Sequence, residues 1–182
     1  MKNVEVERRF LVSGSEWEKL GEGEELWQGY LNTDPDRTVR IRLEGTRGIF
    51  TVKGKRSGNV RTEIEAEISE EKAKAILQHP DGLCHGSPVM KRRFTITTGE
   101  MIWEVDQFKG ENEGLVIAEI EYCGSEEGIK AWESRIDAKC PGWIGKEISD
   151  EIRYHNSRLA MYPFSTWTDE ERESMIRHSR EE

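Results

Sequence analysis

Apolar and polar side chains alternate along most of this chain, with the two-residue period of a β-strand that buries one face. In the first such segment, Val4–Val12, the valines and Phe10 share one face, while Glu5, Glu7 and Arg9 share the other. Seven further segments alternate in the same way and predict strands at residues 26–31, 38–44, 49–55, 61–68, 89–97, 101–108 and 115–122. Most intervals between these strands have hairpin length, which favours an antiparallel sheet over a parallel α/β fold.

Helix signals interrupt the strand pattern at five places. Helices are predicted at residues 15–20, 70–78, 126–139 and 156–161, and from residue 169 toward the end of the chain. Ser69 is placed to cap the second helix, which Pro80 ends. Ser15 with Glu18, and Thr168 with Glu171, have the spacing of a capping box.

The polar faces of the predicted strands are almost entirely charged, which is unusual for a face that only meets water. A solvated face would mix in more Ser, Thr, Gln and Asn. The charges also segregate by strand into a basic and an acidic group. The basic group holds Arg9, Arg40, Arg42, Lys53, Lys55, Arg61, Lys91 and Arg93, and the acidic group holds Glu5, Glu7, Glu63, Glu65, Glu67, Glu104, Asp106, Glu119 and Glu121.

Two pairs of alternate glutamates, Glu5 with Glu7 and Glu119 with Glu121, indicate a metal site. Alternate residues of a strand lie about 6.6 Å apart on one face. Two such pairs brought together would repel each other unless a cation lay between them. Mg²⁺ and similar hard cations bind carboxylate oxygens, waters and phosphate oxygens.

The basic strands predict a polyanionic ligand, because arginine binds phosphate through two donors and lysine through a point charge. Closing about eight strands into a barrel would give all the polar faces one shared interior and remove the exposed edges. The apolar faces would then point outward and be covered by helices. We therefore expect an α+β, mainly antiparallel fold: a closed eight-stranded barrel with a charged tunnel and helices packed outside.

Composition and charge narrow the function classes. The 182 residues are 35% hydrophobic and 35% charged, which fits a fold with a charged interior. A net charge of −9 argues against non-specific nucleic-acid binding, which needs a basic field. Three widely spaced cysteines predict reduced thiols, and no secretory signal or apolar span is visible, so we expect a soluble, cytoplasmic protein that binds no membrane.

The ordered series of motifs resembles the CYTH family, also called triphosphate tunnel metalloenzymes. The segment from Glu5 to Arg9 is similar to the family's opening ExExK signature, with Arg9 in the place of the lysine. Further motifs follow in the family's order at residues 28–31, 40–42, 51–53, 61–65, 91–93, 104–108, 118–121, 143–147, 153–156 and 159–160. The resemblance extends from about residue 3 to residue 162. It divides the chain into a CYTH domain at residues 1–162 and an acidic helical tail at residues 163–182.

The resemblance implies an eight-stranded antiparallel tunnel that binds a triphosphate and a divalent metal, Mg²⁺ or Mn²⁺. The implied metal ligands are Glu5, Glu7, Asp106, Glu119 and Glu121. The implied triphosphate contacts are Arg40, Arg42, Lys53, Lys91 and Arg93, and the basic strand faces add Arg9, Lys55 and Arg61 as candidate contacts. Glu63 and Glu65 are candidates for orienting the attacking water, and Arg9 and Tyr30 complete the candidate catalytic group.

Family members hydrolyse inorganic tripolyphosphate or a nucleoside or thiamine triphosphate, and this sequence looks most like the inorganic triphosphatases. Two alternatives stay open: a class IV adenylyl cyclase, and a non-catalytic polyphosphate or nucleotide binder. Arg9 bears on the choice, because an arginine cannot be deprotonated in a protein, whereas a lysine can. The partner is expected to be a small triphosphate molecule, and a homodimer is possible.

Overall fold

A single antiparallel sheet forms the body of the molecule. The computed structural model describes residues 4–32, 34, 36–55, 62–79 and 81–172, without the side chains of Val4 and Glu5. The strands are β1 (Val4–Val12), β2 (Gly23–Tyr30), β3 (Thr38–Glu44), β4 (Arg47–Lys53), β5 (Glu63–Ser69), β6 (His85–Thr98), β7 (Met101–Lys109), β8 (Val116–Gly124) and β9 (Ile144–Glu147). They lie in the order β5-β4-β3-β2-β6-β7-β8-β1-β9, and every pair of neighbours is antiparallel.

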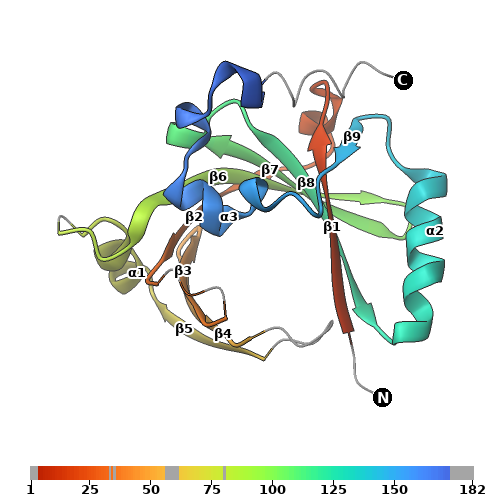
Figure 1. Cartoon of the computed structure of the whole chain (residues 1–182). Coiled ribbons are helices and arrows are strands. Elements are labelled where there is room, and N and C mark those ends of the chain that lie inside the picture. Colours follow the sequence, from red (N-terminus) through yellow and green to blue (C-terminus); the bar gives the residue numbers. More distant parts are fainter. Residues whose placement is uncertain (1–3, 33, 35, 56–61, 80, 173–182) are drawn as a thin grey trace.

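The sheet curls around a hollow but does not close (Figure 1). The α+β class and the antiparallel sheet are confirmed, whereas the closed eight-stranded barrel is not. In the described part of the chain the sheet has nine strands and ends at β5 and β9. Strand β9 pairs with β1 at Phe10 and Val12, so it occupies the β1 edge that closure onto β5 would need. Sequence reasoning missed β9 because it is only four residues long and contains Gly145 and Lys146.

The helices are short, and only some of the predicted caps form. The α-helices are α1 (Glu70–Leu77), α2 (Ile129–Lys139) and α3 (Asn156–Met161), and the 3-10 turns are η1 (Glu16–Lys19), η2 (Gly110–Asn112), η3 (Glu126–Gly128), η4 (Ile152–Tyr154) and η5 (Phe164–Thr166). Ser69 Oγ accepts a hydrogen bond from the Lys72 amide, which confirms that cap. The Thr168 and Glu171 box is also confirmed, because each amide donates to the other side chain. The Ser15 prediction is wrong: its side chain makes no capping hydrogen bond, and the segment is a 3-10 turn.

Two apolar clusters cover the outer, convex face of the sheet. The alternating residues of β1, β6, β7 and β8 pack there with Trp17, Ile136 of α2 and Trp143. On the other half of the sheet, Ile41 and Leu43 of β3 pack against α1. These contacts confirm the prediction of outward apolar faces under α1 and α2 (Figure 1).

A third apolar cluster lies inside the curl and corrects the prediction that every helix packs outside. Residues 148–167, here called the C-terminal segment, cross the concave face, and α3 contacts β6 and β2. Leu159 and Trp167 of this segment pack with Leu11, Val89 and other concave-face residues of the strands. The interior is therefore apolar at one end and charged at the other.

The predicted boundary after residue 162 falls within this packed region. Phe164 and Trp167 belong to the concave cluster, and the Phe164 amide donates to Asn112 Oδ1 at 2.8 Å. The last part of the predicted tail, residues 173–182, lies outside the described residues, so the separate tail stays a prediction. In the part of the chain that is described, we find no helix long and apolar enough to cross a membrane.

Candidate functional site

A cavity of about 770 Å³ occupies the charged end of the concave face. Its described lining includes six cationic side chains, Arg9, Arg40, Arg42, Lys53, Lys91 and Arg93, and six carboxylates, Glu7, Glu63, Glu65, Glu104, Glu119 and Glu121. The strand alternation places them there, because the outward residues between them fill the apolar clusters. The prediction of a charged interior is thus confirmed for these residues.

One side of the cavity, the cationic wall, consists of Arg40 and Arg42 of β3 and Lys53 of β4. Burial and the nearby Arg40 guanidinium lower the pKa of Arg42. Arg40 Nη2 lies 3.4 Å from Thr51 Oγ1, whereas its Nε is buried and has no hydrogen-bond partner in the structure. A buried donor without a partner costs about 1–3 kcal/mol, so this wall is prepared for an anion.

The acidic wall lies across the hollow and consists of Glu7 of β1 with Glu119 and Glu121 of β8. The register sets Glu7 opposite Glu121 and Arg9 opposite Glu119. Burial and the neighbouring Glu119 carboxylate raise the pKa of Glu7 to about 7. Burial also acts to raise the pKa of Glu119, but Lys91, Arg9 and Arg93 outweigh it and hold that pKa low.

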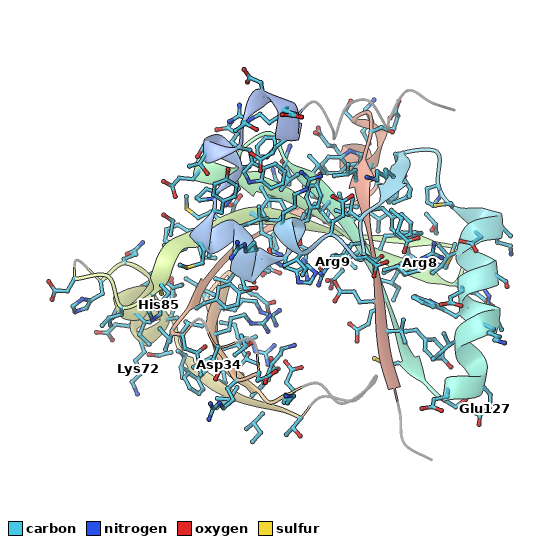
Figure 2. The ribbon with its side chains drawn as sticks, viewed as in Figure 1. Arg8, Arg9, Asp34, Lys72, His85 and Glu127 are labelled. Carbon is cyan, nitrogen blue, oxygen red and sulfur yellow. The ribbon has the colours of Figure 1, made fainter. Side chains whose placement is uncertain are left out.

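Arg9 lies between the two carboxylates of the acidic wall. Its Nε is 2.6 Å from Glu7 Oε1 and 3.0 Å from Glu119 Oε1. Figure 2 shows Arg9 on the hollow side of β1 and Arg8 on the opposite side, toward α2. Arg8 bonds there to Asp137 of α2 and Glu147 of β9. The two adjacent arginines therefore have separate roles, one in the cavity and one in holding α2 and β9 to β1.

Behind the cavity wall, Lys91 of β6 and Asp106 of β7 form a buried ion pair. Lys91 Nζ lies 2.5 Å from Asp106 Oδ2, and both side chains are 1% exposed. Arg93 binds the same carboxylate, with Nε 2.6 Å from Oδ1 and Nη2 2.7 Å from Oδ2. Burial and the nearby Arg93 lower the pKa of Lys91, and Asp106 opposes this shift. The Asp106 oxygens are thus taken by two cations, and Asp106 is not among the lining residues.

Arg93 also connects the back of the cavity to the acidic wall. Its Nη1 pairs with Glu104, and its Nη2 lies 3.1 Å from Glu119 Oε2. Glu119 therefore accepts a hydrogen bond from Arg9 on one oxygen and a hydrogen bond from Arg93 on the other. Burial raises the pKa of Glu104.

The remaining predicted catalytic residues lie at the edges of the cavity. Glu63 Oε2 is 2.8 Å from Lys53 Nζ, and Glu65 Oε1 accepts a hydrogen bond from Thr51 Oγ1 at 3.0 Å. The Tyr30 hydroxyl is within 3.3 Å of Gln28 Nε2, and burial raises the pKa of Tyr30 to about 12.

Besides Asp106, three predicted residues have no described place in the cavity lining. Lys55 is 74% exposed, pairs with Asp36 at 3.1 Å, and is absent from the lining. The Glu5 side chain and the whole of Arg61 lie outside the described residues.

Some lining residues were not predicted as part of the site. They are Gln28, Thr38, Ile102, Glu104, Cys123, His155, Asn156 and Ser157. Glu104 and Cys123 share the face of other charged residues, so alternation signals them. His155, Asn156 and Ser157 enter because the C-terminal segment folds back into the curl, which strand periodicity does not signal.

The donor set of the acidic wall fits a hard divalent cation, because every candidate ligand is a carboxylate. Within the described residues, no three His, Cys, Asp or Glu side chains come close enough together to hold an ion. Glu7 and Glu119 do converge, since Arg9 Nε contacts both. The described part of the acidic wall thus contains a carboxylate pair that already binds the Arg9 guanidinium.

Together, the curled antiparallel sheet and the two walls define a class of protein that holds a charged ligand in a hollow lined by both cations and carboxylates. The chain belongs to the CYTH family, because the CYTH domain model matches residues 3–133. It is 38% identical over 165 residues to an inorganic triphosphatase of Acetivibrio thermocellus, covering 91% of this chain and 98% of the relative. It is 31% identical over 165 residues to one from Nitrosomonas europaea, covering 87% and 97% of the two chains.

The solved structures agree with this assignment. The crystal structure of the inorganic triphosphatase NE1496 superposes with a TM-score of 0.60 and 28% identity, covering 86% of this chain and 94% of that chain. A putative adenylate cyclase from Bacillus halodurans superposes with a TM-score of 0.54 at 21% identity, covering 84% and 100%. The latter likeness shows the shared fold alone.

Proposed function

We propose that this protein is a metal-dependent triphosphatase that hydrolyses inorganic tripolyphosphate in the cavity. The observation that carries the proposal is the opposition of the cationic wall to the acidic wall across one hollow. The two relatives named inorganic triphosphatase support the same function.

The charge balance of the cavity favours a metal–triphosphate complex over a bare triphosphate. The six cations and six carboxylates of the described lining cancel formally. A triphosphate carries several negative charges, so it would leave an excess of negative charge near Glu7 and Glu119. A divalent cation at the acidic wall would offset that excess.

Glu7, Glu119 and Glu121 would hold the ion, and Glu5 stays a predicted ligand. When bound, Mg²⁺ or Mn²⁺ supplies charge neutralisation at the phosphate oxygens. Asp106 is assigned a positioning role in place of the predicted ligand role, because Lys91 and Arg93 occupy its oxygens.

The cationic wall binds and orients the phosphate chain. Arg40 offers its unpartnered Nε to a phosphate oxygen, and Arg42 and Lys53 add charge on the same side. Lys91 and Arg93 contribute positive charge at the back of the cavity, and Asp106 holds both side chains in place. Charged groups fixed in advance stabilise the charge that shifts to the leaving phosphate as the P–O–P bond breaks. Arg61 and Lys55 stay predicted contacts without a described place in the lining.

Glu63 and Glu65 are proposed to orient the attacking water and to accept its proton. Both lie beside the cationic wall, since Glu63 pairs with Lys53 and Glu65 with Thr51. Tyr30 is proposed to help fix the reacting phosphate from the back of the cavity, with its hydroxyl kept protonated by a pKa of about 12. The products would be pyrophosphate and orthophosphate.

The adenylyl cyclase alternative lacks a comparable observation. A cyclase must place an adenine base, and bases commonly stack on aromatic side chains. Among the described lining residues, the aromatic rings are Tyr30, which is buried against Gln28, and the imidazole of His155. A cytoplasmic location, a homodimer and the lack of nucleic-acid or membrane partners remain predictions.

A phosphate-release panel tests the proposal. Purified protein is incubated with tripolyphosphate, ATP or thiamine triphosphate, each with Mg²⁺, Mn²⁺ or EDTA, and phosphate and cyclic AMP are measured. We expect release from tripolyphosphate with either metal and none with EDTA. Arg40→Gln should lower kcat/KM by about tenfold or more, since hydrogen bonds to charged groups contribute ~1.5–3 kcal/mol. Arg47→Gln is the charge-matched control, because Arg47 forms an exposed pair with Glu67 and should retain full activity.

The panel also separates the alternatives. Cyclic AMP from ATP would support the cyclase. Tight binding of tripolyphosphate without turnover in any metal would support a non-catalytic binder and overturn the proposed activity.

A further inference from the structure

Arg9 makes contacts that a simple phosphate-binding arginine would not need. Its side-chain bonds run to Glu7 and Glu119, the two carboxylates that converge at the acidic wall. Its Nε donates to these carboxylates of the acidic wall, in the same cavity as Arg40 and Arg42 of the cationic wall. In this state its guanidinium already fills the role of counter-cation to the carboxylate pair.

The second arginine at this wall is held differently. Arg93 also contacts Glu119, but its Nε and Nη2 are fixed by both oxygens of Asp106, which is 1% exposed. The carboxylates that bind Arg9 are less buried, since the Glu7 and Glu119 side chains are 30% and 15% exposed. If one guanidinium must leave the acidic wall, Arg9 is the movable one and Arg93 is the fixed one.

A divalent ion and Arg9 require the same oxygens. Glu119 Oε1 accepts from Arg9 while Glu119 Oε2 accepts from Arg93, so an ion at this carboxylate would share each oxygen with a guanidinium. Glu7 Oε1 is also occupied by Arg9. An ion between Glu7 and Glu119 would lie beside the Arg9 guanidinium, and the repulsion between these like charges favours release of Arg9.

A triphosphate bound in the cavity would offer an acceptor to the released guanidinium. Arg9 lines the same cavity as the cationic wall, and its long side chain can turn from the carboxylates to a phosphate oxygen, which it binds in a bidentate manner. An anion in the cavity would thus draw Arg9 away from the acidic wall and open that wall to the ion.

We propose that Arg9 is a resident cation of the carboxylate site, displaced by the divalent metal and taken up by bound triphosphate, so that metal and triphosphate binding are coupled through this side chain. The inference rests on the proposed function for the identity of the two ligands. It makes Arg9 a positioning residue that suppresses metal binding until triphosphate is present. Coupling between two ligands is reciprocal, so each must strengthen the binding of the other.

The test measures binding without turnover. Free Mn²⁺ is counted by electron paramagnetic resonance during titration of the wild type, Arg9→Gln and Arg9→Lys at pH 8, with no phosphate present. Tripolyphosphate affinity is measured separately by calorimetry in EDTA. Arg135→Gln is the matched control, because Arg135 pairs with Glu100 on the exposed surface and lies outside the cavity.

We expect two opposite changes in Arg9→Gln: Mn²⁺ alone binds about tenfold more tightly, and tripolyphosphate alone binds about tenfold more weakly, within the usual range for coupled sites. Arg9→Lys keeps a competing cation and should stay within about threefold of the wild type for Mn²⁺. Arg135→Gln should change neither affinity.

Several outcomes overturn the inference. Unchanged Mn²⁺ affinity in Arg9→Gln would reduce Arg9 to a plain phosphate contact, and weaker binding of both ligands would indicate a structural role. Circular dichroism melting of each variant identifies any loss of folding; if Arg9→Gln does not fold, Arg9→Met is titrated in the same way. Failure of the wild type to release phosphate would contradict the proposed function instead, because none of these titrations depends on hydrolysis.

Discussion

At the scale of single residues, ionisation in the cavity depends on which cation lies nearest to each carboxylate. Glu119 stays ionised although it is buried, because Lys91, Arg9 and Arg93 surround it. Glu7 is buried too, lies against the Glu119 charge and has only Arg9 to oppose these two effects, so its pKa rises to about 7. Two glutamates of the same wall therefore titrate in different pH ranges, which follows from neighbours rather than from residue type.

Glu7 predicts a specific pH dependence of stability in the metal-free protein. Below its ordinary value of 4.5 the carboxyl is protonated in both the folded and the unfolded chain. Between 4.5 and about 7 only the folded chain keeps the proton, so the contribution of Glu7 to stability falls as pH rises and is constant above that range. Glu7→Gln removes this loss. The free energy of unfolding of the variant, relative to that of the wild type, should therefore be higher at pH 8 than at pH 5.

Urea unfolding in EDTA at the two pH values measures this difference. Glu67→Gln, in an exposed pair with Arg47, is the control and should show no change with pH relative to the wild type. A Glu7→Gln difference that is equal at pH 5 and pH 8 would show that Glu7 does not carry the raised pKa.

Asp106 predicts a large loss of stability when one partner of the buried network is removed. Asp106→Asn leaves Lys91 buried without its carboxylate and frees Arg93 from its anchor. Breaking a buried pair costs about 3–5 kcal/mol, whereas an exposed pair contributes about 0–1 kcal/mol. In urea unfolding at pH 7, Asp106→Asn should lose about 3–5 kcal/mol of unfolding free energy, and Glu67→Gln about 0–1 kcal/mol. Equal losses for the two variants would contradict the assigned role of the buried network.

At the scale of elements, the C-terminal segment decides where the cavity ends. Leu159 of α3 and Trp167 pack on the concave face with Leu11 and Val89, so the interior there is filled. The same fold-back brings Asn156 to the cavity, where its Oδ1 lies 3.5 Å from Lys91 Nζ. A helix of six residues gains little from its own hydrogen bonds, so this packing is what holds α3 in place.

The close approach of α3 to β6 gives a test of that packing. Gly86 of β6 has φ +68°, and a Cβ there would collide with the backbone oxygen of Ala160 in α3. Gly99, in the turn between β6 and β7, has φ +63° and open space around it. Gly99→Ala should therefore cost only the left-handed backbone strain of ~1–2 kcal/mol, and Gly86→Ala clearly more.

Chemical unfolding compares the two glycine variants, and tripolyphosphate affinity gives a second readout. Gly86→Ala should also weaken binding, because displacing α3 moves Asn156 away from Lys91, whereas Gly99→Ala should not. Equal stabilities for the two variants would show that α3 is not fixed against β6.

At the scale of the whole molecule, the two walls of the cavity come from opposite ends of one open sheet. The cationic wall lies on β3 and β4 near the β5 edge, and the acidic wall lies on β8 and β1 near the β9 edge. In the described residues no ladder joins β5 to β1, so a ligand that contacts both walls would connect parts of the sheet that hydrogen bonds leave apart.

A bridging ligand should therefore raise the melting temperature. A ligand at 100 times its Kd stabilises the folded state by ~2.7 kcal/mol, which corresponds to about 5–10 °C for a chain of this size. We expect that shift with Mg²⁺ and imidotriphosphate, a triphosphate analogue that resists hydrolysis, measured by calorimetry. Mg²⁺ with orthophosphate, which is too short to reach both walls, is the control and should give a much smaller shift. Equal shifts would show that spanning the hollow is not required.

The sequence by itself determined which residues share a face. Strand alternation depends only on local geometry, so it assigned Glu7, Arg40 and Glu119 to one charged interior and Ile41 and Trp103 to the outside. The Ser69 and Thr168 caps were predictable for the same reason, since their partners lie three residues away.

The tertiary structure decided what depends on contacts between distant residues. The addition of β9 to β1 sets the open edge, the C-terminal segment fills one end of the hollow, and Asp106 is engaged by Lys91 and Arg93 rather than facing the cavity. The tertiary structure also decided that Arg9 lies between Glu7 and Glu119. Alternation shows that these charges face inward, but only the register of β1 with β8 and the burial around it decide which cation neutralises which carboxylate.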